Sequence, residues 1–177
     1  MLPDFEIRDL RDHPGLTLPE ETGETFEANS IIKAAGASAH LPGVLVLADD
    51  SGLEVDALKG APGVRSARYS GENATDGTNR AKLKEELARL PSQIFTGRFH
   101  CCMSLVRDGV TLHVAHGAVE GRLLLEEQGA GGFGYDALFV PDGFAESFGV
   151  LPAETKNQLS HRARALAQMS VWMKENL

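Results

Sequence analysis

Two adjacent carboxylic acids, Asp49 and Asp50, stand shortly after the apolar run of residues 44–47. Ser51 and Gly52 follow them, a pair that is typical of turns. The apolar run has the length and composition of a buried strand, and open α/β sheets bind ligands at the carboxyl ends of such strands. Because two carboxylates withdrawn from water repel each other, a divalent cation such as magnesium would stabilise the pair. A solvated turn is the alternative that these residues leave open.

Positively charged side chains follow a second turn, at residues 61–63. Arg65, Arg68 and Tyr69 come within a few residues of that turn. Guanidinium groups bind phosphate oxygens through paired hydrogen bonds. Acids that hold a cation, together with arginines that bind phosphate, are typical of a site for a metal-bound phosphate ester.

The runs ADDSGLEVDAL (residues 48–58) and GAPGVRSARYSG (60–71) resemble the signature of the inosine triphosphate pyrophosphatase family. These enzymes hydrolyse deaminated purine nucleoside triphosphates to the monophosphate and pyrophosphate. The resemblance implies hydrolysis of dITP, ITP or XTP, with magnesium as cofactor and Asp50 as the general base. It implies that Glu20, Asp49 and Asp50 hold the magnesium. Ser51 and Arg68 are expected to contact phosphate or sugar.

The run LPEETGETFEANSIIKA (18–34) resembles the family pattern of an acid, Thr-Gly and a helix that starts with Phe. Glu20 stands where the family has its magnesium-binding glutamate. Lys33 stands where the family has a lysine that reaches the substrate phosphates, although a solvated surface lysine is the alternative. The family usually has Glu-Asn-Ala where this sequence has Ala28-Asn29-Ser30, a departure that affects local helix contacts.

Residues 129–134 contain the G-x-G-x-x-G pattern of dinucleotide-binding proteins. That pattern requires a helix after the glycines, whereas residues 137–141 are typical of a strand, so we reject a Rossmann site. The run GGFGYDALF instead resembles the nucleoside loop of the family. The resemblance implies that Phe133 stacks on the base. Gly134, Tyr135 and Asp136 are expected to complete the pocket wall.

The run KNQLSHR (156–162) resembles a family segment with a lysine followed by Ser-His-Arg. The resemblance implies that Lys156, His161 and Arg162 hold the nucleoside. Hydrogen-bond donors would favour the C6 oxygen of a deaminated purine over the amino group of adenine. Helix capping and surface charge are the alternative roles of Ser-His-Arg.

The elements around these motifs follow from hydrophobic period and capping residues. We expect helices at 25–40 and from Thr75 to Pro91, the second with a stripe of Leu83, Leu87 and Leu90 and a solvated remaining face. A final helix should be capped by Ser160 and bury Leu166, Met169 and Met173. The sequence also predicts an edge strand at 4–8, a strand at 122–126, and a hairpin that pairs 98–107 with 110–119 through Asp108-Gly109.

Three histidines, His100, His113 and His116, fall in that hairpin. Their spacing does not join them to Cys101 and Cys102 in a zinc motif, so packing or surface roles are favoured. We expect the two cysteines to be buried thiols, because the chain shows no export signal.

Composition narrows the class of protein. The formal net charge of −8 argues against a nucleic-acid-binding protein, and the absence of a run of 18 apolar residues argues against a membrane protein. We expect a cytoplasmic enzyme. The family resemblance implies an α/β fold with a long mixed central sheet flanked by helices. It also implies two lobes with an active-site cleft between them, a single domain over 1–177, and a homodimer.

Two alternatives remain: a pyrophosphatase with another base preference, such as GTP or a modified pyrimidine, and a nucleotide-binding module with weak or no catalysis. The family begins with an apolar strand and a Thr-x-Asn-x-x-Lys loop that cradles the triphosphate, and the printed sequence does not contain them. We therefore expect this chain to be less active and less stable than its relatives. A start codon assigned too far downstream would explain the difference.

Overall fold

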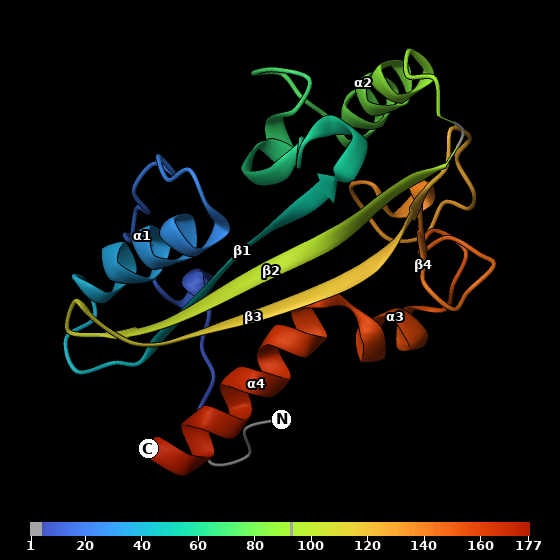
Figure 1. Ribbon diagram of the computed structural model, residues 1–177. Helices are drawn as coiled ribbons and strands as arrows, with labels where there is room; N and C mark the ends of the chain where they lie inside the picture. The colour runs from blue at the N-terminus through green and yellow to red at the C-terminus, as the bar shows by residue number, and fades with distance from the viewer. Residues whose placement is uncertain (1–4, 93) are drawn as a thin grey trace. The chain divides into compact units, whose positions relative to one another are not determined.

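The computed structural model describes residues 5–92 and 94–177, which form an α/β fold with helices beside one four-stranded sheet (Figure 1). The strand order is β1-β2-β3-β4, and neighbouring strands run antiparallel. The strands are β1 (Val46–Val55), β2 (Phe95–Arg107), β3 (Val110–Leu123) and β4 (Phe139–Pro141). The α-helices are α1 (Phe26–Ser38), α2 (Asp76–Ala88), α3 (Ala153–Leu159) and α4 (His161–Asn176). The predicted α/β class is confirmed.

The chain divides into two compact units. Unit 1 holds the chain up to Asp50, together with Cys102–His116 and Ala165–Leu177. Unit 2 holds Ser51–Cys101 and Gly117–Arg164. Each unit contains residues from the sequence motifs.

Threonine caps start the first two helices. The Thr25 hydroxyl accepts a hydrogen bond from the backbone N–H of Ala28, and the Thr75 hydroxyl accepts one from that of Thr78. Such caps satisfy backbone donors that have no partner within the helix. Leu83 and Leu87 of α2 are fully buried, as predicted, and Leu90 packs against the same core.

The predicted hairpin is present and longer than expected. Asp108 and Gly109 form its turn with φ angles of 50° and 76°, the left-handed values that a two-residue hairpin requires. The core of unit 2 packs around the adjoining strands and the segments that follow. It consists of Leu53, Val55, Leu83, Leu87, Phe95, Phe99, Val119, Leu123, Tyr135, Leu138, Phe139 and Phe148.

Four local predictions were wrong. Residues 5–8 form no strand, and residue 4 lies outside the described residues. The strand expected at 122–126 is the end of β3, which stops at Leu123 where it pairs with Phe139. Leu166 is exposed, although Met169 and Met173 are buried as predicted. Helix α3 was not predicted, because its seven residues carry no hydrophobic period and bury no side chain.

The central prediction about β1 also needs correction. Asp49, Asp50, Ser51 and Gly52 do not form a turn after a strand; they lie in the middle of β1. The apolar residues before them are not uniformly buried, since Val44 and Leu47 are about half exposed. The strand extends because Leu53 and Val55, two residues apart, both enter the core and carry the extended backbone onward.

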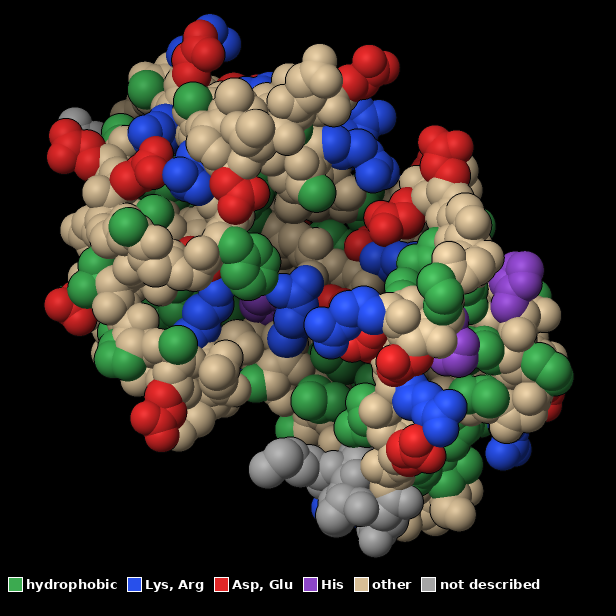
Figure 2. All heavy atoms as spheres, turned by 180° about the vertical axis from the view of Figure 1, so that it is seen from behind, with side chains coloured by type: hydrophobic (Ala, Val, Ile, Leu, Met, Phe, Trp, Pro, Cys, Tyr) green, Lys and Arg blue, Asp and Glu red, His purple; other side chains and the backbone are tan. Residues whose placement is uncertain are grey.

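Side chains of both charges lie on the face seen in Figure 2, and the chain as a whole is acidic. Among the described residues no helix combines the length and the apolar character that crossing a membrane would require.

Candidate active site

In unit 1, one buried carboxylate is held by side chains from helix α1. The Asp50 side chain lies 3.0 Å from the Lys33 ammonium group through Oδ1 and accepts a 3.2 Å hydrogen bond from Asn29 Nδ2 through Oδ2. Lys33 Nζ also lies 3.1 Å from Glu21 Oε1. We call Glu21, Asn29, Lys33 and Asp50 the acid cluster.

The helical spacing of α1 explains this arrangement. Asn29 and Lys33 are four residues apart, so they share one face of the helix and both reach Asp50. The other end of the Asn29 amide is used as well, because Oδ1 accepts a 2.7 Å hydrogen bond from the backbone N–H of Gly23. A Cβ atom at Gly23 would lie 2.6 Å from that oxygen, which explains why glycine stands there.

The acid cluster keeps Lys33 charged. Burial disfavours the ammonium ion, but hydrogen bonds and charge interactions with Asp50 and Glu21 outweigh burial and raise the Lys33 pKa above its usual value. A protonated lysine at this point can leave the carboxylates and form an ion pair with an incoming phosphate group instead.

The predicted magnesium ligands do not converge by themselves. In the described part of the chain, the carboxylate oxygens of Glu20, Asp49 and Asp50 do not form a group within 4.8 Å of one another. Glu20 is exposed. Lys33 forms ion pairs with Asp50 and with Glu21, the neighbour of Glu20. The donor set still suits magnesium, because all of these groups offer hard carboxylate oxygens.

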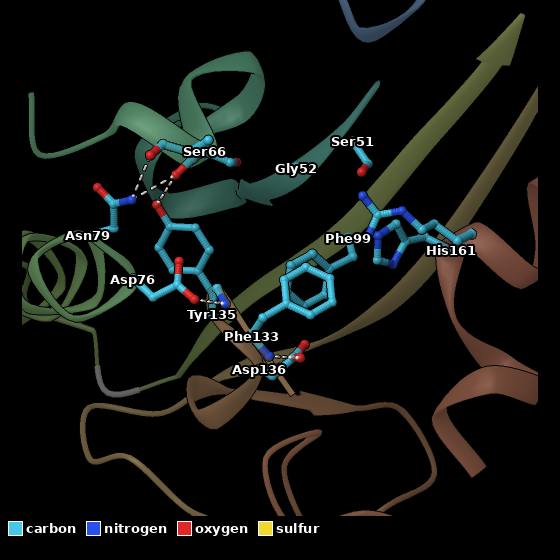
Figure 3. Close-up of a pocket in the computed structure, with 13 residues that line it drawn as sticks. Ser51, Gly52, Ser66, Asp76, Asn79, Phe99, Phe133, Tyr135, Asp136 and His161 are labelled. Carbon is cyan, nitrogen blue, oxygen red and sulfur yellow. Dashed lines mark hydrogen bonds between the residues drawn. The ribbon is translucent and has the colours of Figure 1, made fainter. Parts of the chain in front are cut away.

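In unit 2, a cavity of about 190 Å³ combines aromatic rings with polar groups (Figure 3). We call it the aromatic pocket. Its lining residues come from β1, the 3-10 helix Gly63–Arg68, α2, β2, the glycine-rich loop and the start of α4. They are Ser51, Gly52, Ser66, Ala67, Asp76, Asn79, Phe99, Phe133, Gly134, Tyr135, Asp136, His161 and Arg162.

Two carboxylates hold the backbone of the glycine-rich loop. Asp136 Oδ2 accepts a 2.8 Å hydrogen bond from the N–H of Phe133, and Asp76 Oδ2 accepts a 2.6 Å bond from the N–H of Gly134. Gly132 has a φ of 73°, and a side chain there would collide with the Asp136 carboxylate. The loop therefore depends on glycine for both its backbone angle and its close contact.

The far wall of the aromatic pocket is fixed by hydrogen bonds to one backbone carbonyl. The Tyr135 hydroxyl donates to the carbonyl oxygen of Ser66 at 2.8 Å, and Asn79 Nδ2 donates to the same oxygen at 3.2 Å. Burial raises the pKa of Tyr135 well above its usual value, so this phenol remains a hydrogen-bond donor.

Phe133 stands at the mouth of the pocket with 59% of its surface exposed. Lys156 Nζ lies 4.5 Å from the centre of its ring, and the Arg162 guanidinium carbon lies 5.5 Å from it. Lys156 also forms an ion pair with the buried Asp136. His161, only 5% exposed, stacks on Phe99 at 5.0 Å between ring centres. An exposed aromatic ring beside two cations can accept a flat, electron-rich ligand.

Comparison with known proteins identifies the family. The Ham1 family model matches residues 1–172. This chain belongs to the Ham1 family. It is 47% identical to the dITP/XTP pyrophosphatase of Desulforamulus reducens over 92% of this chain and 80% of the relative. It is also 47% identical to that of Geobacter sulfurreducens over 92% and 81%. The solved Staphylococcus aureus Ham1 protein superposes with a TM-score of 0.89 at 36% identity, covering 99% of this chain and 90% of that one.

The structure of this Ham1 chain brings together most of the residues predicted for nucleoside binding. Phe133, Gly134, Tyr135, Asp136, His161 and Arg162 all line the aromatic pocket, and Lys156 contacts two of them. Ser51, predicted to contact phosphate or sugar, also lines it. Arg68, predicted to contact phosphate or sugar, is exposed at the end of a short 3-10 helix, Gly63–Arg68, and does not line the pocket.

Sequence reasoning missed several residues of both sites. Asp76 and Asn79 lie on the face of α2 that was expected to be solvated, yet Asn79 is buried and both hydrogen-bond to backbone groups of the pocket. Ser66 was not singled out in the sequence. The sequence does contain a signal for Asn79. Asparagine is a weak helix former, so an asparagine one turn after a helix cap indicates a hydrogen-bonding role rather than simple exposure to solvent.

Proposed function

We propose that this chain hydrolyses non-canonical purine nucleoside triphosphates, of the dITP, ITP and XTP class, to the monophosphate and pyrophosphate. The observation that carries the proposal is the aromatic pocket, in which an exposed ring, two adjacent cations and a buried histidine surround a space lined by backbone and amide groups. The family membership and the names of the relatives support the same reaction.

Catalysis is assigned to the acid cluster. Asp50 is proposed as the general base that takes a proton from the attacking water, and Asp49 as a supporting acid. Lys33 would shift from Asp50 toward the phosphates, with Arg68 and Ser51 as further phosphate or sugar contacts. Magnesium held by Glu20, Asp49 and Asp50 would neutralise phosphate charge.

Base selection is assigned to the aromatic pocket. Phe133 is proposed to stack on the purine, with Gly134, Tyr135, Asp136 and Lys156 around the nucleoside. His161 and Arg162 would donate hydrogen bonds to the C6 oxygen. Adenine presents an amino group at that position, and a donor facing another donor leaves both without a hydrogen bond.

A substrate panel tests the proposal. Pyrophosphate release should be measured with dITP, ITP, XTP, GTP, ATP and a modified pyrimidine triphosphate, with and without magnesium and with chelator. We expect kcat/KM for the deaminated purines to exceed that for ATP, and chelation to abolish turnover. Preference for a pyrimidine or ATP would contradict the base assignment, and preference for GTP, which also carries a C6 oxygen, would contradict the deaminated-purine class. Binding without pyrophosphate release would identify a nucleotide-binding module.

We further propose a homodimer in the cytoplasm, on the basis of the family resemblance alone. Light scattering of the purified chain over a range of concentrations tests the oligomeric state. A mass of one chain at all concentrations would contradict the dimer without affecting the proposed reaction.

A further inference from the structure

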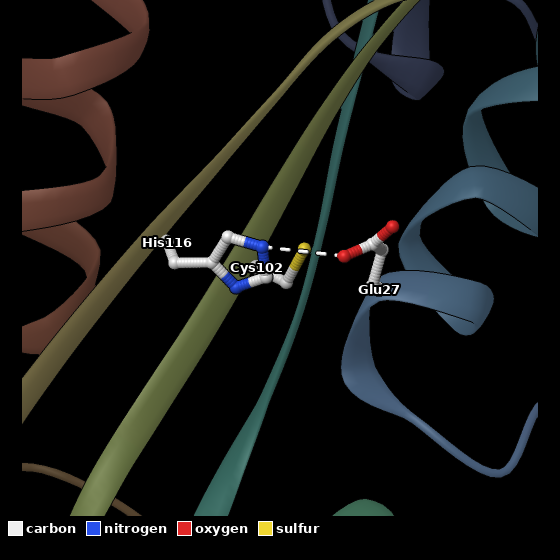
Figure 4. A group of neighbouring side chains, drawn as sticks. All are labelled: Glu27, Cys102 and His116. Atoms are coloured by element: carbon white, nitrogen blue, oxygen red, sulfur yellow. Dashed lines mark ion pairs between the residues drawn. The ribbon is translucent and has the colours of Figure 1, made fainter.

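A cluster of three different potential metal ligands lies in unit 1, outside the acid cluster. Glu27 comes from the first turn of α1, Cys102 from β2 and His116 from β3 (Figure 4). One ligand atom from each lies within 4.8 Å of the others. The three residues are far apart in the sequence, so the spacing of cysteines and histidines could not reveal them.

The distances suit a tetrahedral ion. His116 Nε2 lies 3.3 Å from Glu27 Oε2. Nitrogen and oxygen ligands of zinc lie at about 2.0–2.2 Å, so two of them at a tetrahedral angle are separated by about 3.3 Å. The Cys102 sulfur lies within 4.8 Å of both atoms, and Figure 4 shows the three side chains next to one another. Small side-chain rotations would therefore complete a three-ligand site with a fourth position left for water.

The surroundings also favour a cation. Cys102 is fully buried, and its sulfur lies within 4.8 Å of a Glu27 carboxylate oxygen. A divalent ion would compensate the negative charge of the thiolate, because one thiolate and one carboxylate balance two positive charges. The Ser30 hydroxyl donates a hydrogen bond to the sulfur at 3.5 Å, and this bond would stabilise the thiolate. Glu27 and His116 are about half exposed, which leaves an entry path from solvent.

We propose that Glu27, Cys102 and His116 form a binding site for a zinc-class divalent metal, separate from the oxygen-ligand site proposed for magnesium. On binding, the Cys102 thiol loses its proton to solvent and the sulfur bonds to the metal, while His116 binds as the neutral imidazole. Thiolate and imidazole ligands select zinc or cobalt over magnesium, since magnesium prefers oxygen.

Cobalt is the direct probe. Metal-free protein should be titrated with Co²⁺ while thiolate-to-cobalt charge-transfer and visible d–d absorbance are recorded, and Zn²⁺ should then be added. We expect saturation at about one ion per chain, displacement by zinc, and no displacement by a large excess of magnesium. A spectrum without a thiolate band, or displacement by magnesium, would overturn the proposal.

Variants assign the ligands. Cys102→Ser should abolish the charge-transfer band, and His116→Gln and Glu27→Gln should each weaken cobalt binding by at least about tenfold. Cys101→Ser, which changes the adjacent buried cysteine, is the matched control and should keep the band. His116→Gln and Glu27→Gln alter half-exposed side chains, so they test the site even if Cys102→Ser does not fold. Unchanged binding in both would overturn the proposal. The readout is spectroscopic, so it does not depend on pyrophosphatase activity.

Discussion

The acid cluster and the aromatic pocket both depend on carboxylates, but these carboxylates bond to different partners. In the acid cluster, Asp50 bonds to the side chains of Asn29 and Lys33. In the aromatic pocket, Asp76 and Asp136 accept hydrogen bonds from backbone N–H groups, although Asp136 also forms an ion pair with Lys156. A backbone partner stays where the fold holds it, whereas a lysine side chain can rotate to another acceptor at a modest cost in free energy.

This difference matches the tasks proposed for the two sites. A binding pocket gains affinity when its shape exists before the ligand arrives, because ordering costs are already met. A hydrolytic site must change charge partners as phosphate and metal enter. The comparison predicts that substitutions in the acid cluster reduce turnover and that substitutions in the aromatic pocket alter selectivity.

The largest effect is expected from Asp50→Asn. The amide keeps the shape of the carboxylate but cannot accept a proton, and general-base catalysis typically contributes about 10²–10⁴-fold. Pyrophosphate release should therefore fall by at least about a hundredfold with the fold intact by circular dichroism. Asp142→Asn, a change at an exposed loop acid, is the matched control. A variant that kept more than about a tenth of wild-type turnover would exclude Asp50 as the base.

Lys33→Gln should have the next largest effect. The substitution removes a charge-assisted contact, worth about 1.5–3 kcal/mol, and leaves Asp50 and Glu21 without the cation between them. We expect kcat/KM to fall by about ten- to a hundredfold. Lys174→Gln, near the end of α4, controls for general loss of positive charge. Equal kcat/KM in the two variants would show that Lys33 has only a structural role.

Local sequence signals predicted the elements that depend on neighbours in the chain. Thr25 and Thr75 cap their helices, and Asp108-Gly109 forms the hairpin turn, because capping and turn geometry involve only a few consecutive residues. Likewise, the glycine-rich loop leads through a single 3-10 turn, Asp136–Leu138, into β4, as the rejection of a Rossmann site requires.

Features that depend on tertiary contacts could not be predicted in the same way. Whether Glu20 or Glu21 meets Lys33 depends on how the preceding loop lies against α1, and no local rule separates two adjacent glutamates. Asp49 and Asp50 were placed at the end of a strand because Ser51-Gly52 is typical of a turn, but the core contacts of Leu53 keep the segment extended. The family resemblance, rather than local propensity, located the pocket residues.

Selectivity should change in the aromatic pocket. Arg162→Ala and His161→Ala each remove a proposed donor to the C6 oxygen, a loss of about 1–3 kcal/mol, or about 5- to 150-fold. We expect the ratio of kcat/KM for ITP to that for ATP to fall by such a factor, while the affinity for nucleotides in general changes less. Arg162 is the more informative position, because His161 is buried and stacks on Phe99. An unchanged ratio in both variants would remove them from base selection.

The smallest effect is expected at Glu127, at the edge of the aromatic pocket. There the glycine-rich loop is supported by ion pairs between side chains rather than by backbone hydrogen bonds to a carboxylate. Glu127 lies 2.9 Å from both Arg80 and Lys84 of α2, and Arg80 also donates to the carbonyl oxygen of Gly134 at 2.8 Å. The hydrogen bond from Lys84 and the neighbouring charges lower the Glu127 pKa below its usual value. Because the pKa is lower in the folded state, this carboxylate stabilises the fold above its unfolded pKa, and the contribution is lost as the pH falls through the folded pKa.

Glu127→Gln should therefore destabilise the protein at pH 7 and should destabilise it less at pH 3. Solvent exposure limits the loss to about 0.5–1 kcal/mol, or about 1–4 °C in Tm for a chain of this size. Thermal unfolding of both proteins at the two pH values measures the difference, and Glu126→Gln, at the adjacent exposed acid, is the matched control. A difference that persisted in full at pH 3 would indicate that packing of Glu127, rather than its charge, supports the pocket. Equal stability at pH 7 would mean that the hydrogen bonds donated by backbone N–H groups to Asp76 and Asp136 suffice to hold the loop.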